Sequence, residues 1–335
     1  MQLLENKIVK TLLGREAFQQ FQQGNIAKWH LEKYANLIKL LSESYVSSDK
    51  EEILKNMSVA DLAVAYALYY LPINFYKLLN IFSEIGLENV STLRVLDYGA
   101  GPATGTLAAL RICKNLEATV FDKSEQMLHV AERLLKGSSE NITITSRVKD
   151  FASKNFDLII VANALNEFSV EDEDNFIKHL DHLLAPNGIV LILEPALQNV
   201  ARNLCRFREK ILAVYNYDIL YPCTHCLPCP MLNESENWCH ASLDGLDSRL
   251  VSQLDDITSY NKHRVKYSSL VLQKREQRNS EDQYRIVDLP KKDKRGITLK
   301  LCGTSFYGTK LFKKDAVTLD GEKIKKQKFF DKVRL

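Results

Sequence analysis

Apolar residues recur at helical spacing through the first ninety residues of the chain. The stretches 37–44, 59–71 and 73–87 each place apolar side chains three or four positions apart, which is the period of a helix with one buried face. Pro72 lies between the last two stretches, and proline lacks the N–H that a helix interior needs, so we predict a break there. We interpret residues 1–90 as a helical N-terminal region that packs on the domain after it.

From residue 91 the pattern changes to apolar runs that alternate with amphipathic segments. The segments 103–116 and 125–135 have helical periodicity. Short strand-like runs lie between these segments, and strands that alternate with helices predict a parallel, doubly wound sheet. These runs are 93–99, 117–124, 141–148, 156–165 and 188–195. We therefore predict an α/β fold with a Rossmann domain over residues 91–200.

The alternation stops after the Rossmann domain. Residues 201–260 are polar and turn-rich, and they hold five of the seven cysteines, so we treat them as a cysteine-rich insertion. Strand-like runs separated by charged turns return over residues 261–335. We predict that this last region supplies a final antiparallel strand to the main sheet and then forms a small basic β-module.

Composition places the chain among ordinary globular proteins. The 335 residues are 45% hydrophobic and 26% charged, and this length predicts more than one compact region. Residues 1–18 carry Glu5 and Glu16 and lack the apolar core of a secretory signal, and we find no apolar run long enough to span a membrane. We expect a cytoplasmic, reducing compartment and no membrane contact. Cysteines in such a compartment are metal ligands or buried apolar groups more often than disulfides.

Charge is distributed unevenly along the chain. Residues 261–335 contain 21 Lys and Arg against 9 Asp and Glu, a net charge of +12, whereas residues 1–260 contain 24 against 33, a net charge of −9. A basic segment on an acidic body predicts a nucleic-acid partner, because cationic side chains neutralise phosphates. The alternative is a solvated, lysine-rich surface. The candidates for phosphate contact are Lys291, Lys292, Lys294 and Arg295.

A glycine-rich turn follows the first predicted strand. Gly99, Gly101 and Gly105 let the backbone turn sharply and approach a ligand at the start of the next helix. Asp122 ends the next strand, where an acid can accept hydrogen bonds from ribose hydroxyls. Asp97 completes the pattern D-x-G-x-G, which is typical of methyltransferases that bind S-adenosylmethionine and differs from the dinucleotide pattern G-x-G-x-x-G. We predict a class I methyltransferase-type domain in which Asp97 meets the amino-acid end of S-adenosylmethionine. A loop that binds nothing is the alternative.

Polar residues follow the fourth predicted strand. The carboxyl ends of strands in such a sheet face the ligand crevice, so Asn163, Asn166 and Glu167 are candidates for the substrate side of a catalytic site. The sequence has no Asn-Pro-Pro-Tyr motif there and no cysteine nucleophile. These residues therefore do not identify the chemistry of a methyl transfer.

Four of the five cysteines in the insertion lie close together in the sequence. Cys223, Cys226 and Cys229 are spaced three apart, and Cys239 follows ten residues later. Thiolates gathered in one loop repel one another unless a cation lies between them, so the spacing predicts a metal site. Zinc and iron–sulfur clusters both use four thiolates, and C-x2-C-x2-C followed by proline is similar to part of a ferredoxin motif.

Other residues near this run leave the ligand set open. His225 and His240 are alternative ligands for zinc. Cys113 falls in the predicted helix after the glycine turn, and Cys205 falls in another helical stretch, so we interpret both as core residues without a ligand role.

The chain from about residue 59 onward resembles the methyltransferase-like mitochondrial small-ribosomal-subunit assembly family, which has class I methyltransferase relatives and bacterial members. The resemblance rests on eight segments in a fixed order. These are AVAYALYYLPINFYKLL, VLDYGAGPATG, DLIIVANALNEF, LILEPAL, PCTHCLPCPML, NWCHASL, YSSLVLQK and LKLCG. The chain departs from the family pattern at Thr224, at Ala103 and at Ala196.

The resemblance implies a [4Fe-4S] cluster bound by Cys223, Cys229, Cys239 and Cys302, with Cys226 as an extra thiol or alternative ligand. It also implies S-adenosylmethionine as cofactor and the small ribosomal subunit or its rRNA as partner, through assembly or rRNA methylation. Two alternatives stay open. One is a non-catalytic ribosome assembly factor of the same fold, and the other is a small-molecule methyltransferase with a structural zinc site.

Overall fold

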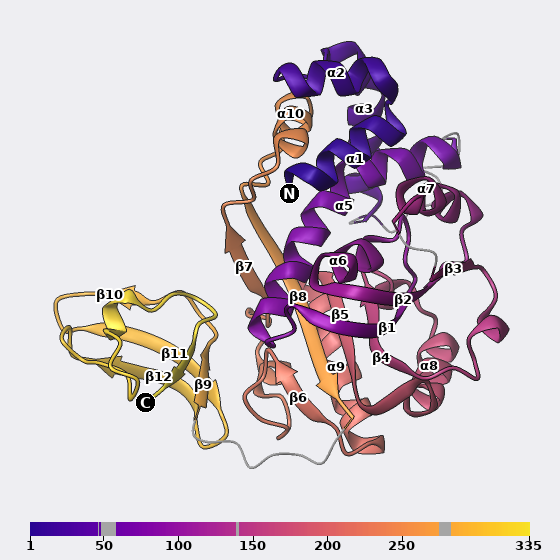
Figure 1. Ribbon diagram of the computed structural model, residues 1–335. Coiled ribbons are helices and arrows are strands. Elements are labelled where there is room, and N and C mark those ends of the chain that lie inside the picture. The colour runs from indigo at the N-terminus through magenta and orange to yellow at the C-terminus, as the bar shows by residue number, and fades with distance from the viewer. Residues whose placement is uncertain (46, 48–57, 139–140, 275–282) are drawn as a thin grey trace. The chain divides into compact units, whose positions relative to one another are not determined.

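The structure is a computed structural model, and Figure 1 labels its helices and strands. The residues group into two compact units. The first unit comprises Met1–Ser153 and Leu243–Val265, and the second comprises Lys154–Ser242 and Lys266–Leu335. The structure describes all residues except 46, 48–57, 139–140 and 275–282. We describe each unit by itself.

The first unit combines helices with a short parallel sheet. Its helices are α1 (Gln2–Leu12), α2 (Gly14–Gln23), α3 (Lys28–Ser44), α5 (Val59–Glu84), α6 (Thr104–Ile112), α7 (Glu125–Leu135) and α10 (Arg249–Thr258). Its strands are β1 (Val90–Tyr98), β2 (Cys113–Phe121) and β3 (Ile142–Thr145), and the 3-10 turn η1 is Val148–Asp150. The strands lie in the order β3-β2-β1, with Leu96 opposite Thr119 and Val120 opposite Ile144. Because both pairs are parallel, α6 and α7 serve as the crossovers, as predicted.

Pro72 does not break a helix. The chain is helical from Val59 to Glu84, with Pro72 inside α5. Proline removes one helical hydrogen bond at most sites, but Leu68, Tyr69 and Leu71, which point to different sides of this helix, are fully buried. Burial on several sides outweighs the lost bond, so the predicted break was wrong.

The same helix corrects a second expectation. Among the described residues, α5 is long and apolar enough to cross a membrane by length and composition, with a mean hydropathy of 1.2 over its most apolar window. The sequence does therefore contain one run of spanning length. Since 72% of that window is buried inside the structure, α5 has the environment of a core helix.

A buried carboxylate joins the two chain segments of the first unit. Glu5 on α1 is only 3% exposed and accepts hydrogen bonds from Ser248 Oγ and Leu250 N, both at 2.8 Å. These donors lie at the start of α10, where helical N–H groups lack partners within the helix. The N-terminal helix thus caps a helix that comes more than two hundred residues later.

The predicted helix over 103–116 ends early. α6 stops at Ile112, and Cys113 has extended backbone angles and begins β2 opposite Val90. Pairing with β1 satisfies the backbone of these residues, which outweighs their helical periodicity. Cys113 is buried, as a core residue is expected to be.

The second unit holds the other strands of the predicted Rossmann sheet. Its strands β4 (Phe156–Ala162), β5 (Leu184–Pro195), β8 (Arg264–Gln273) and β6 (Asp218–Tyr221) lie in that order, and β7 (Ala241–Asp244) also pairs with β8. Its helices are α8 (Val170–Leu183) and α9 (Gln198–Val214), and its 3-10 turns are η2 (Leu165–Glu167) and η3 (Pro230–Asn233). β4 and β5 are parallel, whereas β8 is antiparallel to β5. The predicted α/β fold and its final antiparallel strand are both confirmed.

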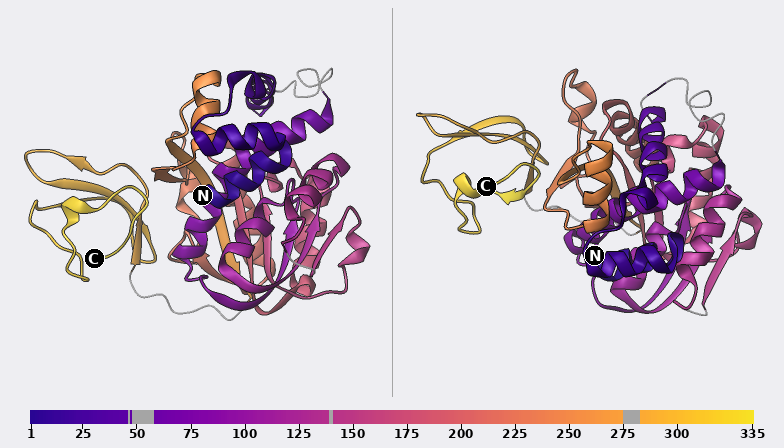
Figure 2. Two further views of the ribbon diagram at one scale, coloured as in Figure 1. Left: turned by 45° about the horizontal axis from the view of Figure 1, so that its top comes forward. Right: turned by 90° about the horizontal axis from the view of Figure 1, so that it is seen from above.

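The C-terminal residues form a separate small sheet, which we call the β-module (residues 283–335; Figure 2). It contains β9 (Gln283–Ile286), β10 (Lys291–Lys292), β11 (Ile297–Gly303), β12 (Tyr307–Phe312), β13 (Lys332–Arg334) and the turn η4 (Ile324–Lys326). β9, β10 and β12 all pair with β11, and β13 pairs with β9. Its core is apolar and consists of Ile286, Ile297, Leu299, Leu301, Ile324 and Val333.

Candidate cofactor and metal sites

The turn after β1 contains three left-handed residues. Gly99 has φ 66°, Gly101 has φ 53° and Ala103 has φ 65°, and α6 begins at Thr104. Glycine adopts this conformation readily, whereas alanine is strained by its Cβ. The chain therefore winds tightly beneath the N-terminus of α6, and Gly105 lies buried in its first turn. This is the geometry that the glycine pattern predicts for a nucleotide-binding loop.

Asp122 braces this loop from the end of β2. Its Oδ2 accepts a hydrogen bond from Gly101 N at 2.7 Å, and its Oδ1 accepts one from Ser124 N at 2.8 Å. One carboxylate thus joins the glycine turn to the start of α7. The acid that the sequence assigns to ribose recognition stands at the predicted place beside the loop.

Asp97 is engaged within the protein. It is 1% exposed, and its Oδ2 accepts hydrogen bonds from Thr106 N at 2.7 Å and from Thr106 Oγ1 at 2.9 Å. Burial raises the pKa of the Asp97 carboxyl to about 7, against the lowering effect of the hydrogen bonds from Thr106. In this structure Asp97 therefore fixes the first turn of α6 to β1. Sequence reasoning missed Thr106, because a threonine early in a helix gives no specific signal.

The candidate substrate residues differ in exposure. Asn163 follows β4 with φ 57°, its N–H donates to Leu193 O at 2.7 Å, and its buried Nδ2 has no hydrogen-bond partner among the described residues. Asn166 and Glu167 lie exposed on η2. The structure thus brings Asn163 to the end of β5 and leaves the other two on the surface of the same turn.

Glu194 supports that turn and was not predicted as a site residue. It is 1% exposed, and its Oε1 accepts a hydrogen bond from Leu165 N at 2.9 Å, while its Oε2 has no hydrogen-bond partner in the described part of the chain. Burial raises the pKa of the Glu194 carboxyl to about 8, although hydrogen bonds from the backbone of η2 oppose the shift. The sequence did contain a signal for this residue, because a charged side chain at the end of an apolar strand is unusual.

Four of the seven cysteines line one pocket in the second unit. Cys223 and Cys229 come from the loop after β6, Cys239 precedes β7, and Cys302 comes from β11 of the β-module. The pocket encloses about 360 Å³ of empty space, including the part open to solvent. Its full lining is Arg208, Pro222, Cys223, Thr224, His225, Cys229, Pro230, Met231, Cys239, Arg285, Val287 and Cys302.

Arg208 on α9 organises the cysteine loop. The side chain is 2% exposed, and its Nη2 donates to His225 O at 2.9 Å and to Leu227 O at 2.8 Å. The neighbouring Glu209 contacts Arg208 and accepts a hydrogen bond from Cys229 N at 3.1 Å. One turn of α9 therefore holds three backbone groups of the loop. Sequence reasoning missed Arg208, because it lies outside every cysteine motif.

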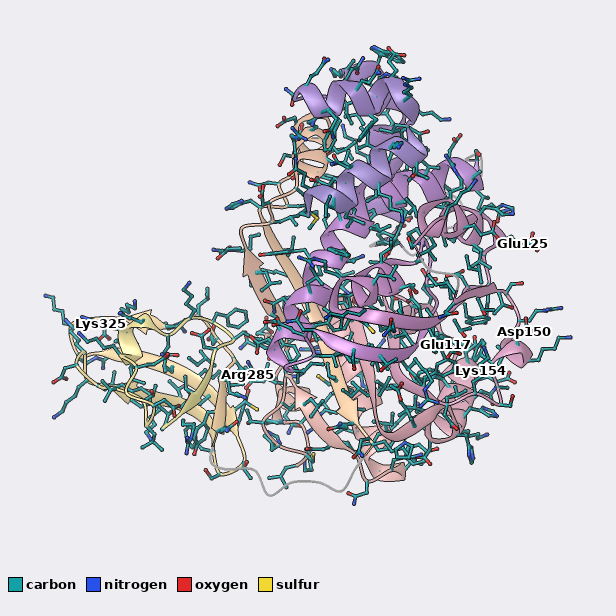
Figure 3. The ribbon with its side chains drawn as sticks, in the orientation of Figure 1. Glu117, Glu125, Asp150, Lys154, Arg285 and Lys325 are labelled. Carbon is teal, nitrogen blue, oxygen red and sulfur yellow. The ribbon has the colours of Figure 1, made fainter. Side chains whose placement is uncertain are left out.

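Arg285 on β9 reaches the same pocket from the β-module (Figure 3). It is buried and donates to Pro222 O and to Phe330 O, each at 2.9 Å. Glu234, in the loop after η3, also contacts the β-module. Its Oε1 accepts hydrogen bonds from Lys300 Nζ at 2.7 Å and from Tyr307 Oη at 2.5 Å. These bonds fasten the β-module to the cysteine loops.

The pocket thiols influence one another electrostatically. Burial, together with the neighbouring Cys223 and Cys229, raises the pKa of the Cys302 thiol to about 12. Burial and the other three thiols raise the pKa of Cys239 well above its usual value. Since these thiols disfavour each other's ionisation, a bound cationic centre would stabilise all of them as thiolates.

The other two cysteines of the second unit lie outside the pocket lining. Cys226 Sγ is directed to Tyr217 O at 3.7 Å. Cys205 on α9 is half-buried beside Cys229, and its hydrogen bond lowers the pKa of the Cys229 thiol, with help from the charge of Arg208. The lining therefore contains the four cysteines of the family pattern and omits Cys226 of the local-spacing pattern.

The two histidines also differ. His225 is buried with its Nε2 at 3.5 Å from Cys302 Sγ, and no described residue hydrogen-bonds to its Nδ1. His240 is outside the lining, and its Nδ1 lies 3.0 Å from Trp238 O. Only His225 therefore stands among the pocket thiols.

The pocket lining supplies four thiols as possible donors to a metal centre. Across the described part of the chain, no three His, Cys, Asp or Glu side chains stand close enough together to hold one metal ion. A [4Fe-4S] cluster fills the space between its thiolates with iron and sulfide, so its ligands stand farther apart. Three buried polar atoms lack hydrogen-bond partners within the described structure, and such donors can hydrogen-bond to sulfur: Thr224 Oγ1, His225 Nδ1 and Arg208 Nε.

The basic residues singled out in the sequence lie around β10. All four are exposed, but Lys291 lies 3.9 Å from Asp288 and Arg295 lies 3.0 Å from Asp293. Lys292 Nζ donates to Lys325 O at 2.9 Å. Two of the four predicted phosphate contacts are thus already paired with acids.

A comparison with protein families matches residues 60–327 to the family described as "Mitochondrial small ribosomal subunit Rsm22". The chain belongs to this family. The matched range includes the glycine turn, both acids of the loop and all four pocket cysteines, and it confirms the resemblance inferred from the sequence.

Curated relatives are methyltransferases. The demethylmenaquinone methyltransferase of Thermotoga maritima is 31% identical over 154 residues, which cover 42% of this chain and 63% of that protein. The match therefore spans less than two thirds of the relative's length. An uncharacterized methyltransferase of Staphylococcus carnosus is 26% identical over 47% of this chain and 72% of that protein.

Solved methyltransferase structures are also similar. A methyltransferase from Pyrococcus furiosus has a TM-score of 0.41 at 15% identity, over 72% of this chain and 98% of that chain. An S-adenosylmethionine-dependent methyltransferase from Geobacter sulfurreducens, in complex with S-adenosyl-L-homocysteine, has a TM-score of 0.35 at 18% identity, over 61% of this chain and 91% of that chain.

Proposed function

We propose that this protein binds S-adenosylmethionine, contains a [4Fe-4S] cluster, and acts on the small ribosomal subunit or its rRNA, in assembly or in rRNA methylation. The observation that carries the proposal is the family match over residues 60–327, because a single match includes both the nucleotide loop and the cysteine pocket. A reducing compartment, such as the cytoplasm, would keep the thiols available as ligands.

The proposed binding of S-adenosylmethionine rests on the glycine turn. Gly99 and Gly101 have left-handed backbone angles and no Cβ that would obstruct a ligand, and Asp122 lies beside the turn, where an acid can accept hydrogen bonds from ribose hydroxyls. Asp97 would act indirectly, because it holds Thr106 and hence the start of α6 in place. The sulfonium of S-adenosylmethionine supplies the driving force of a methyl transfer, while the protein binds and orients the reactants.

The proposed [4Fe-4S] cluster rests on Cys223, Cys229, Cys239 and Cys302. A cluster held there would connect the loops after β6 and before β7 to the β-module, which is a structural role. Four thiolates would also leave none of its irons open to S-adenosylmethionine. Zinc bound by the same pocket is the competing assignment, and it would favour the small-molecule methyltransferase.

The proposed RNA contact rests on the net positive charge of the β-module. The β-module contains 15 Lys and Arg against 6 Asp and Glu, a net charge of +9 over residues 283–335. Such a surface attracts RNA phosphates without regard to sequence.

A second candidate is a non-catalytic assembly factor of the same fold. It is favoured by η2, where Asn166 and Glu167 are exposed and the buried acid Glu194 holds the backbone of the turn. This candidate predicts binding of S-adenosylmethionine and RNA without methyl transfer to any rRNA.

The decisive experiment is anaerobic purification followed by iron, sulfide and zinc analysis and a visible absorbance spectrum. We expect broad visible absorbance and about four irons per chain, lost in Cys223→Ser and Cys302→Ser and kept in the matched control Cys226→Ser. Stoichiometric zinc without iron would refute the cluster. Calorimetric titration with S-adenosylmethionine tests the other site independently, and Asp122→Asn should weaken binding there without changing the iron content.

A further inference from the structure

Arg285 stands beside a cysteine of the pocket in the strand register of the β-module. On β9 it lies directly opposite Cys302 on β11, whereas the next pair, Ile286 and Leu301, belongs to the buried core of the β-module. Residues directly opposite in an antiparallel pair point to the same face, and neighbouring pairs point to opposite faces. Arg285 and Cys302 therefore point together away from that core, and both line the cysteine pocket.

The Arg285 guanidinium is removed from water. The residue is 5% exposed, and its guanidinium carbon lies 5.2 Å from the ring centroids of both Tyr221 and Phe330. Its Nε and Nη1 donate to the carbonyls of Pro222 and Phe330, each at 2.9 Å, and Pro222 directly precedes Cys223. Because a guanidinium stays protonated even when it is buried, these contacts fix a permanent positive charge at the pocket.

This charge acts on the thiols around it. Burial raises the pKa of the Cys239 and Cys302 thiols, and the charge of Arg285 opposes that rise at both of them. Arg208 is the other buried guanidinium of the lining, but it forms an ion pair with Glu209, which offsets part of its charge. The positive charge of Arg285 thus stabilises negative charge on the sulfur atoms of the pocket.

We infer that Arg285 compensates the negative charge of the [4Fe-4S] cluster proposed for this pocket and thereby raises its reduction potential. Four thiolates outweigh the positive charge of the cluster core, so the bound cluster is an anion, and reduction adds one electron without making or breaking a bond. A buried cation stabilises the more negative form more strongly than the less negative one. The inference rests on the proposed cluster and adds the residue that balances its charge.

The test is an anaerobic redox titration of the full-length protein, with dithionite as the electron donor and electron paramagnetic resonance of the reduced cluster as the readout. Arg285→Gln keeps a hydrogen-bond donor but removes the charge, whereas Arg285→Lys keeps the charge but lacks the planar fork. At a fixed potential, Arg285→Gln should lower the ratio of reduced to oxidised cluster about tenfold, a shift of about 59 mV for one electron. Arg285→Lys should stay within about twofold of the wild-type ratio.

The matched control is Lys332→Gln on β13. Lys332 lies directly opposite Arg285 across the other edge of β9, but it is exposed. Water and salt screen an exposed charge, so this variant should change the ratio of reduced to oxidised cluster by less than about twofold. Iron and sulfide analysis of every variant shows how much cluster it retains.

The outcomes separate the charge of Arg285 from its hydrogen bonds. Loss of iron from Arg285→Gln, with iron retained in Arg285→Lys, would also support the inference, because the anionic cluster would then require the cation. Three results would overturn it while the proposed cluster survives: an unchanged ratio in Arg285→Gln with full iron content, an equal fall of the ratio or loss of iron in Arg285→Lys, and a wild-type cluster that dithionite does not reduce. A wild-type protein without iron would remove the cluster from the proposed function as well.

Discussion

Replacing Arg208 with methionine should destabilise the cysteine loop without removing any thiol. Methionine fills a similar volume but donates no hydrogen bond, so the carbonyls of His225 and Leu227 would lose donors at 2.9 and 2.8 Å. Each buried acceptor without a partner costs about 1–3 kcal/mol. The loss of both bonds, and of the buried charge beside Glu209, should lower the free energy of unfolding by about 3–5 kcal/mol.

A tryptophan close to the loop makes the effect measurable. The chain has two tryptophans, and Trp238 Nε1 donates to Ala196 O at 2.8 Å, beside Cys239. In a Trp29→Phe background, urea unfolding followed by fluorescence therefore reports on the second unit. Iron content after anaerobic purification is the second readout, and it should fall in Arg208→Met.

The matched control is Arg206→Met on the same helix. Arg206 is exposed and donates only to the Asn203 side chain in the described structure, at 2.7 Å, so its loss should cost less than about 0.5 kcal/mol. Arg208→Lys should fall between the two, because lysine keeps the charge but cannot reach two carbonyls with a planar fork. Equal unfolding midpoints for Arg208→Met and Arg206→Met would refute the assigned role of Arg208.

Three further substitutions test other contacts. The raised pKa of Glu194, about 8 against an ordinary 4.5, means that the folded state retains a proton which the unfolded state releases, so this group costs stability as pH rises between those values. Glu194→Gln should therefore flatten the dependence of the melting temperature on pH between about 4.5 and about 8, and an unchanged slope would contradict the assignment. Thr106→Val removes the hydroxyl bond to Asp97 at 2.9 Å, and it should cost about 1–2 kcal/mol in thermal unfolding and weaken S-adenosylmethionine binding in calorimetry. Glu5→Ala leaves Ser248 Oγ and Leu250 N without an acceptor, so it should cost about 2–3 kcal/mol, and hydrogen exchange at the start of α10 should accelerate.

Local sequence patterns predicted the features whose cause is local. The turn through Gly99 and Gly101 needs backbone angles that glycine adopts easily, so the residue types report the geometry directly. The same holds for the strands of the sheet, whose apolar runs reflect burial on both faces. The spacing of Cys223, Cys226 and Cys229 correctly indicated a thiol-rich loop but could not show which thiols face one pocket.

Features that depend on distant partners were missed. α5 continues through Pro72 because tertiary packing buries it, and nothing within the helix reports that packing. Arg208 hydrogen-bonds to a backbone group 17 residues away in the sequence, and Glu194 hydrogen-bonds to one 29 residues away. Cys302 was assigned to the pocket only by resemblance to the family, since its own strand contains no second cysteine. The contributions of such residues follow from three-dimensional proximity, which a single sequence does not encode locally.

The position of Cys302 in the chain has a consequence for biosynthesis. A ribosome releases the chain from its N-terminus, so Arg208 and the first three pocket cysteines emerge before β11 does. A product that terminates before β11 has the glycine turn and three of the four pocket cysteines, but it lacks both the fourth thiol and the strand that carries it. Only chains translated through β11 can close the pocket, so possession of a complete cysteine site distinguishes a finished protein from a truncated one.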